Sequence, residues 1–517
     1  MNFPALTILT FLPVAGAIIL LLLPRTNPTL PRVTAATLSL ITLAYTIALW
    51  LRFDHTSTAF QFEDRHVWIA ALHVDYRLAI DGIGLLMLLL TAIVIPIGIA
   101  ASWRSIQHRT SLYYALILLL QACMFGTFTA LNFFHWFIYW ELSLIPAFFL
   151  IRLWGGNRAG PAATQFLVYT MVGSVTMLLS FLAIYLTTGT FDFTELATLA
   201  QGNHLIPAVV DHLNWHSVTP NHAVLILFAG AFLGFAVKVP LIPFHTWLPA
   251  AYTEAPSGTT AILTGAMSKM GVYGFLRILL PIFFPQMQQV LTPLYWLAVA
   301  TIVLSAFAAL AQKDLKRIFA YSSINHLGYC LLGAFALVAR PTDAYLTPEK
   351  YAALSGILLQ LLSHAITAAT IFWFISLLES RADGHRYLSD FGGLRRIAPV
   401  FAGLMGIALF SSLGLPGLNG FPGEFLIFKG TFPLVSWATS ISVLGLLITA
   451  VFILNVIQKV FTGPLNPDRA AFTDLATGER LAFAPAIALM FVLGLYPQLV
   501  LSALNSTVIQ YMHHLTL

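Results

Sequence analysis

The sequence predicts an all-α polytopic membrane protein with about 14 transmembrane helices, and three observations support this fold class. Hydrophobic residues make up 59% of the 517-residue chain, whereas charged residues make up only 9%, a composition far from that of soluble globular proteins. The apolar residues gather in stretches of about 20, the length that a helix needs to cross a bilayer. Short polar connections separate the stretches, so residues 1-517 are expected to form one integral membrane domain.

Each predicted helix is a mostly apolar stretch that charged, proline or glycine residues delimit. The first begins close to the N-terminus without a basic stretch before it, so we expect a retained helix rather than a signal peptide. In chain order the predicted helices cover residues 4-23, 32-51, 79-101, 112-132, 134-152, 164-187, 222-244, 253-282, 290-311, 316-339, 351-378, 397-430, 434-461 and 481-502.

Lysine and arginine are unevenly divided between the two sets of connections. Sixteen are assigned to connections that follow odd-numbered helices, and seven, Arg277 and Arg340 among them, to the opposite side. Because basic residues concentrate in cytoplasmic loops, we expect both termini outside the cytoplasm, in a bacterial cytoplasmic membrane. This sorting explains the basic net charge without nucleic acid. The long outer connections, about 52-78 and 188-221, are expected to fold as a cap and contain Trp68, His73, His204, Trp215 and His216.

Four ionisable residues lie inside predicted helices: Glu141, Lys238, Lys269 and Glu424. A charge at the centre of a bilayer costs about 3 kcal/mol on insertion scales, so such residues usually mark an ion pathway. Proton or cation transport is therefore the expected function. Both cysteines of the chain also lie inside predicted helices and define neither a disulfide framework nor a metal site.

Two predicted helices, the seventh and the twelfth, are interrupted beside an ionisable residue. In the seventh, Pro240 and Pro243 follow Lys238. Because proline has no N–H to donate, the helix must kink or open at this point. In the twelfth, a stretch rich in glycine and proline, residues 414-423, precedes Glu424. Lipid cannot satisfy the freed carbonyl groups, so water, a neighbouring helix or a polar side chain must do so.

The two breaks indicate a pair of inverted five-helix repeats. The first block would cover residues 112-282 and the second 290-461, with 1-101 and 481-502 as flanking helices, and the broken helix is the fourth of each block. The first block starts in the cytoplasm and the second outside, an inversion common among transporters. Proline and glycine also occur in transmembrane helices without function, but matched breaks beside charges favour a shared role.

The ionisable residues could pass protons to one another. Burial disfavours the charged form of Lys238 and a nearby carboxylate favours it, so Glu141 could load and unload this lysine if helices 5 and 7 pack together. A static ion pair between two helices is the alternative. Lys269 lies midway through helix 8, where a relay is expected, and Glu424 would be the next site toward the exit.

Three histidines extend this set. His326 and His364 could bridge Lys269 and Glu424, since an imidazole both donates and accepts protons, although a lone histidine in a helix is equally often a packing residue. His245, just beyond the first break, could help proton entry or cap a helix. The chain has no cysteine cluster, P-loop or dinucleotide fingerprint. Any driving energy must therefore come from an ion gradient or from a partner.

At these residues the chain resembles the antiporter-like subunits of respiratory complex I, the proton-translocating NADH:quinone oxidoreductase. In this family, glutamate rather than lysine at the second break is typical of the M-type subunit, called subunit four in mitochondria and D in chloroplasts. The short end after helix 14 also differs from the L type. The resemblance extends from Asp81-Gly82-Ile83 to helix 13, and its most specific pieces are Tyr139-Trp140-Glu141-Leu142, residues 236-249, Tyr321-Ser322-Ser323-Ile324-Asn325-His326-Leu327-Gly328 and Gly420-Phe421-Pro422-Gly423-Glu424-Phe425.

The resemblance implies a function and a set of site residues. It implies one proton-translocating subunit beside L-type and N-type neighbours, with flavin, iron-sulfur clusters and quinone in partner subunits and no cofactor in this chain. Residues 255-259 and 265-268 drift toward hydrogenase-related homologues. The alternatives are a multisubunit cation/proton antiporter, a membrane-bound hydrogenase-type complex, or a scaffold subunit without a working channel. Carried over by position, Glu141 and Lys238 match the family's ion pair, Lys269 its central lysine, His326 and His364 its connecting histidines, and Glu424 its terminal site.

Overall fold

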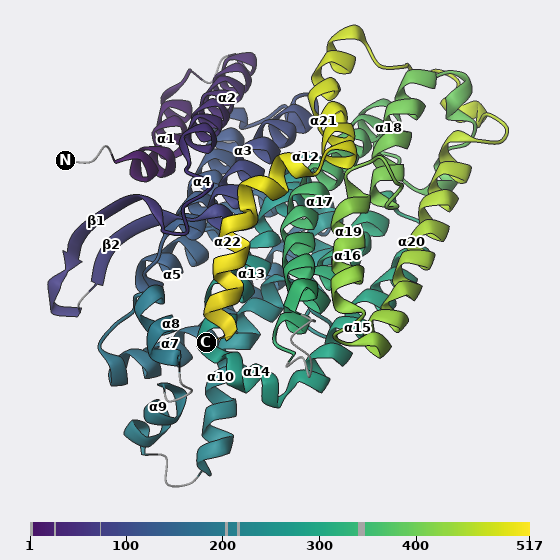
Figure 1. Ribbon diagram of the computed structural model, residues 1–517. Coiled ribbons are helices and arrows are strands. Elements are labelled where there is room, and N and C mark those ends of the chain that lie inside the picture. The colour runs from purple at the N-terminus through teal and green to yellow at the C-terminus, as the bar shows by residue number, and fades with distance from the viewer. Residues whose placement is uncertain are drawn as a thin grey trace.

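The computed structural model describes residues 4–24, 27–72, 74–201, 205–214, 218–339 and 347–516. Its long helices pack side by side, with a two-stranded hairpin at one edge and the C-terminal helix running across the bundle (Figure 1). Several residues that the sequence singles out lie outside the described residues: His73, His204, Trp215 and His216 of the outer connections, and Arg25 and Arg340 of the charge pattern.

The helices and strands follow one another in this order. The α-helices cover Ala5–Leu22 (α1), Thr29–Arg52 (α2), Gly82–Ser102 (α3), Thr110–Thr129 (α4), Phe133–Leu142 (α5), Leu144–Trp154 (α6), Ala159–Thr188 (α7), Phe193–Ala200 (α8), Leu205–Leu213 (α9), Pro220–Lys238 (α10), Trp247–Glu254 (α11), Ser257–Ile262 (α12), Lys269–Gly274 (α13), Leu280–Gln289 (α14), Leu291–Leu310 (α15), Leu315–Leu337 (α16), Thr347–Arg381 (α17), Pro399–Ser412 (α18), Gly420–Thr431 (α19), Ser436–Phe461 (α20), Thr477–Leu495 (α21) and Gln498–Thr516 (α22). The other elements are strands β1 (Gln61–Ile69) and β2 (Val74–Ile80), 3-10 turns η1 (Ala70–Leu72), η5 (Leu388–Asp390), η6 (Leu394–Arg396) and η7 (Pro467–Arg469), and π-helical turns η2 (Leu263–Met267) and η3 (Phe275–Leu279).

The polytopic membrane fold is confirmed. Within the described residues, 12 helices are long and apolar enough to cross a membrane. The sequence predicts about 14 because it also counts two segments that differ in character. The tenth, 316-339, forms α16 but contains two charges, Lys316 and Arg317, and a polar stretch around His326. The twelfth, 397-430, divides into α18 and α19, each shorter than a bilayer is thick.

Both interruptions that the prolines and glycines predict are present. α10 ends at Lys238, and residues 239–246 separate it from α11. α18 ends at Ser412, and residues 413–419 separate it from α19, whose first turns carry Glu424. The broken helices therefore place an ionisable residue at the end of one segment and at the start of another.

The last predicted helix, 481-502, is also divided, which the sequence analysis does not predict. α21 ends at Leu495 and α22 begins at Gln498, after Pro497. Gly494 packs against the second interruption, since a Cβ added to it would lie 2.4 Å from the Gly417 carbonyl oxygen. Pro497 interrupts this helix, but no charged residue adjoins the interruption. An adjoining charge is the signal that marks the other two breaks.

The outer connections contain folded elements. β1 and β2 pair as an antiparallel hairpin, and Arg77 on β2 forms an ion pair of 2.7 Å with Asp192, next to α8. We call this the hairpin end of the bundle. The basic end lies at the other end of α3, where Arg104 shares Glu479 with Arg381.

The eighth span is assembled from helical and π-helical pieces. α12, η2, α13, η3 and α14 follow one another from Ser257 to Gln289. The two π-helical turns flank α13, which begins with Lys269, and the second contains Arg277. Such turns are rare and occur frequently at functional sites.

Glycine contacts hold the second broken helix against α17. A Cβ added to Gly430 in α19 would lie 2.5 Å from the backbone nitrogen of Ala353, and one added to Gly423 would lie 2.8 Å from that of Gln360. Small residues allow membrane helices to approach backbone to backbone. These contacts set the distance between the polar side chains of α17 and α19.

The Gly430→Ala substitution tests this packing. The added methyl group would force α17 and α19 apart, and overpacking of this kind costs about 1–3 kcal/mol. We expect a lower temperature of thermal unfolding for the detergent-solubilised protein. Gly406→Ala in α18 is the matched control, because a Cβ there meets nothing within 4 Å. Equal unfolding temperatures for the two variants would contradict the close approach of the helices.

Candidate functional site

Lys238 is buried at the end of α10, with 2% of its surface exposed. Its ammonium lies 4.8 Å from the centre of the Trp140 ring and donates a hydrogen bond of 3.4 Å to Ser143 Oγ. A desolvated cation over an indole face gains about 2 kcal/mol. At the break after α10, Lys238 therefore faces the fifth span, consistent with packing between helices 5 and 7.

Glu141 lies near the end of α5 and is partly buried. It does not contact Lys238 directly: the structure describes both residues, and no nitrogen–oxygen distance between them is 4.0 Å or shorter. Glu141 Oε1 is buried without a hydrogen-bond partner. The direct contacts of Lys238 are with Trp140 and Ser143, on either side of this glutamate in the chain.

A small cavity joins the first break to the eighth span. It has a volume of about 10 Å³ and is lined by Lys238, Tyr252, Ser268 and three apolar side chains. That volume accommodates about one water molecule. Ser268 immediately precedes Lys269, so the cavity brings the first lysine to the neighbourhood of the second.

Lys269 is completely buried and has two hydrogen-bond partners. Its ammonium lies 2.7 Å from His364 Nδ1 on α17 and also donates to the carbonyl oxygen of Thr264 in η2. Neither partner is an anion. Because a buried charge without an opposite charge is costly, Lys269 and His364 are groups between which a proton can move.

His326 joins His364 to Glu424. The two imidazole rings lie 5.1 Å apart between centroids, and His326 Nδ1 lies 3.0 Å from Glu424 Oε1. Gln360 Nε2 also donates to that oxygen at 3.2 Å. Lys269, His364, His326 and Glu424 therefore form a continuous buried row, which the structure assembles from α13, α17, α16 and α19.

The second break positions His364 and Glu424. Asn419 Nδ2 donates to the carbonyl oxygen of Ser363 at 3.1 Å, beside His364. Gly414 has φ +81°, and a Cβ added to it would lie 2.6 Å from Glu424 Oε2. A glycine is required at this position both for its left-handed backbone and for the approach of the carboxylate.

His245 is not part of the row. It lies in the segment between α10 and α11, is partly exposed, and has a buried Nδ1 atom without a hydrogen-bond partner. Its ring lies 6.3 Å from that of Tyr321 at the start of α16. Of His245, His326 and His364, His245 is the one that is not buried.

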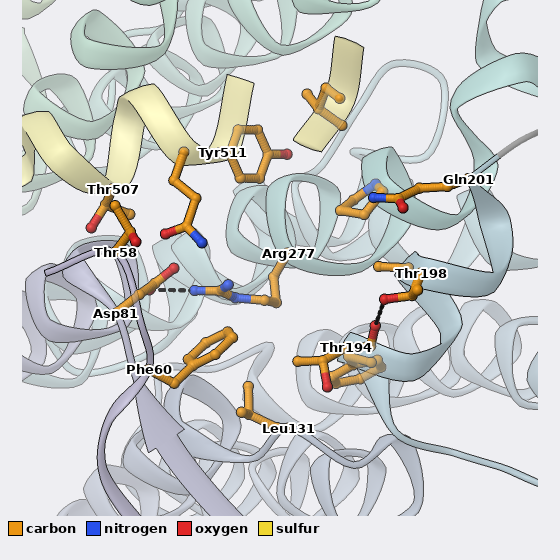
Figure 2. A pocket seen from close by; sticks show the side chains of 15 residues that line it. Thr58, Phe60, Asp81, Leu131, Thr194, Thr198, Gln201, Arg277, Thr507 and Tyr511 are labelled. Carbon is orange, nitrogen blue, oxygen red and sulfur yellow. Dashed lines mark hydrogen bonds and ion pairs between the residues drawn. The ribbon is translucent and has the colours of Figure 1, made fainter. Parts of the chain in front are cut away.

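One buried ion pair escapes the sequence analysis. Arg277, which the charge count assigns to an outer connection, lies inside the eighth span and pairs with Asp81 before α3. Figure 2 shows this pair beside a cavity of about 200 Å³, with Thr507 and Tyr511 of α22 above it. The signal that could have found the pair is the position of Arg277, eight residues after Lys269 within segment 253-282.

The fold and the site define a class of protein before any comparison. It is a polytopic membrane protein in which two interrupted helices hold a lysine and a glutamate, and a row of proton-binding side chains lies inside the bundle. Such intramembrane rows serve the translocation of protons or cations.

Comparison with known proteins gives the family. The model of the family described as NADH:quinone oxidoreductase/Mrp antiporter, TM, matches residues 130–452, and the chain belongs to this family. NADH-quinone oxidoreductase subunit M of Rhodobacter capsulatus is 34% identical, with 97% of this chain and 95% of the relative covered. The protein of the same name from Rickettsia conorii is 32% identical, with 98% of each chain covered.

Solved structures share the fold. A chain of respiratory complex I from Thermus thermophilus with bound NADH matches with a TM-score of 0.83 at 26% identity, and 99% of both chains is covered. A chain of the Mrp complex from Dietzia sp. matches with a TM-score of 0.81 at 20% identity, again over 99% of both chains. The likeness to the Mrp complex concerns the fold alone.

The Arg277→Gln substitution tests the buried ion pair at the hairpin end. Removing one partner leaves Asp81 as an uncompensated buried charge, which costs about 3–5 kcal/mol. We expect a clear drop in the unfolding temperature of the solubilised protein, partly restored in the Arg277→Gln/Asp81→Asn double variant. Arg65→Gln, which breaks the more exposed pair with Asp75, should have little effect. A single variant as stable as this control would sink the interpretation.

Proposed function

We propose that this chain is one proton-translocating subunit in the membrane arm of a complex I-type NADH:quinone oxidoreductase. The observation that carries the proposal is the buried row of Lys269, His364, His326 and Glu424. Every member of the row binds and releases protons, and the broken helices hold it inside the bundle. Relatives that match nearly the whole chain bear the name of the M subunit of this enzyme.

The row gives a path for one proton at a time. A proton on Lys238 passes through the small cavity beside Ser268 to Lys269. The Lys269 ammonium gives it to His364 Nδ1 across 2.7 Å. It moves through the two imidazoles and reaches Glu424 Oε1 across the 3.0 Å contact with His326. No electrons move in this chain, and each donor is reloaded by the group before it.

Glu141 is positioned to drive the first step. Lys238 contacts Trp140 and Ser143, so a closer approach of the Glu141 carboxylate would stabilise its ammonium form, and a withdrawal would expel the proton toward Lys269. Quinone reduction in partner subunits would supply the energy for that movement. Each proton moved against the membrane potential requires about 2.3 kcal/mol per 100 mV.

The same proposal includes the organisation of the chain in its membrane. Residues 112-282 and 290-461 would be inverted five-helix repeats, since α10–α11 and α18–α19 occupy the fourth place in each block. Both termini would lie on the non-cytoplasmic side of a bacterial cytoplasmic membrane. The basic residues that cluster where α3 and α17 end support this orientation.

The partners follow from the family. The chain would lie between L-type and N-type neighbours in the membrane arm. It would bind no cofactor itself, and flavin, iron-sulfur clusters and quinone would belong to other subunits. The second candidate is a subunit of a cation/proton antiporter or of a membrane-bound hydrogenase-type complex. The family description names the Mrp antiporter beside the oxidoreductase, which supports the antiporter as the second candidate.

The Lys238→Ala and Glu141→Ala variants test the mechanism. We expect proton pumping by the reconstituted complex to fall about tenfold, because loss of an acid–base group slows the proton transfer to which quinone reduction is coupled. Coupled electron transfer should fall with it while the complex assembles. Lys429→Ala, which removes an exposed lysine paired with Glu349, is the control. Unaltered rates of both proton pumping and NADH oxidation in the two variants would support the scaffold interpretation instead.

Purification of the intact complex separates the candidate reactions. An oxidoreductase should carry flavin and iron-sulfur absorbance and oxidise NADH with quinone as acceptor. Mass spectrometry of the same sample should identify the neighbouring subunits. A complex without these absorbance bands, which moves protons in vesicles only in exchange for sodium, would identify an antiporter.

A further inference from the structure

Gln360 is a buried glutamine that contacts two members of the row. It lies on α17, one turn before His364, and 2% of its surface is exposed. Its Nε2 atom donates to Glu424 Oε1 at 3.2 Å and lies 3.5 Å from His326 Nδ1. Since His326 Nδ1 itself lies 3.0 Å from Glu424 Oε1, the three atoms form a triangle. One amide nitrogen therefore faces both atoms of the last proton transfer in the row.

The oxygen end of this amide makes no hydrogen bond to the residues that the structure describes. Gln360 Oε1 is buried without a partner. It packs against α19, where a Cβ added to Gly423 would lie 2.7 Å from it. A buried polar atom without a partner is costly and rare in native structures. Its retention indicates that the nitrogen end, which contacts the row, has a function.

The hydrogen bonds that His326 needs change when its proton leaves. An imidazolium has a hydrogen on both ring nitrogens, so Nδ1 donates to the Glu424 carboxylate. After the transfer, Glu424 Oε1 has the hydrogen and Nδ1 has become an acceptor. The other nitrogen, Nε2, keeps its hydrogen and lies 3.4 Å from Ser412 Oγ, which can accept it. Because the site is buried, Nδ1 requires a new donor as soon as Glu424 turns its hydrogen away.

We propose that Gln360 is a positioning residue, which takes the place of Glu424 at His326 Nδ1 once the proton has crossed. Before the transfer, the amide donates to the Glu424 carboxylate. Afterwards it donates to Nδ1, across the 3.5 Å contact. The Glu424 hydroxyl can then turn away from the imidazole and pass its proton on. Gln360 neither gains nor loses a proton: one N–H bond of His326 breaks and one O–H bond of Glu424 forms.

This exchange gives the transfer a direction. A neutral imidazole has one acceptor nitrogen. Without the amide, the Nδ1 lone pair would hold the Glu424 hydrogen, and the proton would return to His326. With the amide, a Gln360 N–H occupies that lone pair and slows the return. The inference rests on the proposed function, because it concerns the last step of the same proton path.

Proton pumping by the complete complex in liposomes, together with thermal unfolding of the purified complex, tests this role. Gln360→Met keeps about the same side-chain length without an N–H, and Gln360→Glu keeps the shape without the amide hydrogens. We expect both variants to pump about tenfold more slowly, the factor that corresponds to about 1.4 kcal/mol for one unsatisfied buried acceptor. The unfolding temperature of Gln360→Met should not fall, because the substitution also removes the partnerless Oε1.

Gln121 provides the matched control. It is a completely buried glutamine of another membrane-spanning helix, α4, and neither end of its amide has a hydrogen-bond partner within the described part of the chain. Gln121→Met removes a buried amide as Gln360→Met does, but at a distance from the row along the sequence. We expect it to pump as the unaltered complex does.

Infrared difference spectra of the resting and the NADH-driven complex add a readout that packing alone does not move. The C=O stretching band of the Glu424 carboxylic acid can be assigned by its loss in Glu424→Gln. We expect this band to shift in Gln360→Met, because the amide no longer contacts the carboxyl group. In Gln121→Met the band should stay in place.

Each other outcome identifies the part that fails. If either Gln360 variant pumps normally while Glu424→Gln does not, the role of Gln360 is wrong and the proposed function stands. If Gln360→Met unfolds at a lower temperature or leaves the band unmoved, Gln360 is a structural residue and the inference is again wrong. Equal impairment of Gln121→Met would contradict it too. If Glu424→Gln pumps normally, the proposed function fails with the inference.

Discussion

An apolar bilayer offers no hydrogen-bond partner to an open helix, and the rest of this structure depends on that constraint. The indole N–H of Trp247 donates to the Val237 carbonyl oxygen at 2.9 Å, and the N–H of Ile242 donates to Thr301 Oγ1 at 3.0 Å. At the second break, Asn419 donates to the Ser363 carbonyl oxygen of α17 at 3.1 Å. Polar side chains that satisfy an interrupted backbone also provide an interior in which a lysine or a glutamate can remain buried. The breaks after α10 and α18 and the buried charges beside them therefore occur together.

The buried charged residues fall into two groups by the partners they have. Arg277 and Glu379 have charged partners at the ends of the bundle, where ion pairs join several elements. Lys269 instead has a histidine and a carbonyl oxygen, and Lys238 has a serine and an indole ring. An ion pair fixes a charge in place, whereas a lysine with neutral partners can exist with or without its proton. Composition alone does not separate these groups, because both appear as charges in apolar sequence.

The sequence predicts the elements whose cause is local. Proline and glycine mark the breaks after α10 and α18, and apolar length marks the spans. The sequence also singles out Lys269 and Glu424 of the row, because ionisable residues are rare in apolar helices. What the sequence does not predict depends on packing between distant segments. Examples are the pairing of Arg277 with Asp81, the place of Gln360 beside Glu424, and the hydrogen bond of Lys238 to Ser143 rather than to Glu141. The division before α22 has a local cause, Pro497, but no charge drew attention to it.

The divided C-terminal helix mechanically links parts of the protein that the proton path separates. Glu479 at the start of α21 holds Arg104 and Arg381 at the basic end. Gly494 rests on the interruption between α18 and α19, and Thr507 of α22 accepts a hydrogen bond from the Gly82 N–H at the hairpin end. Because close-packed interiors transmit displacement rather than absorb it, a shift of this one helix would reach both membrane surfaces and the second break at the same time. It acts as a strut.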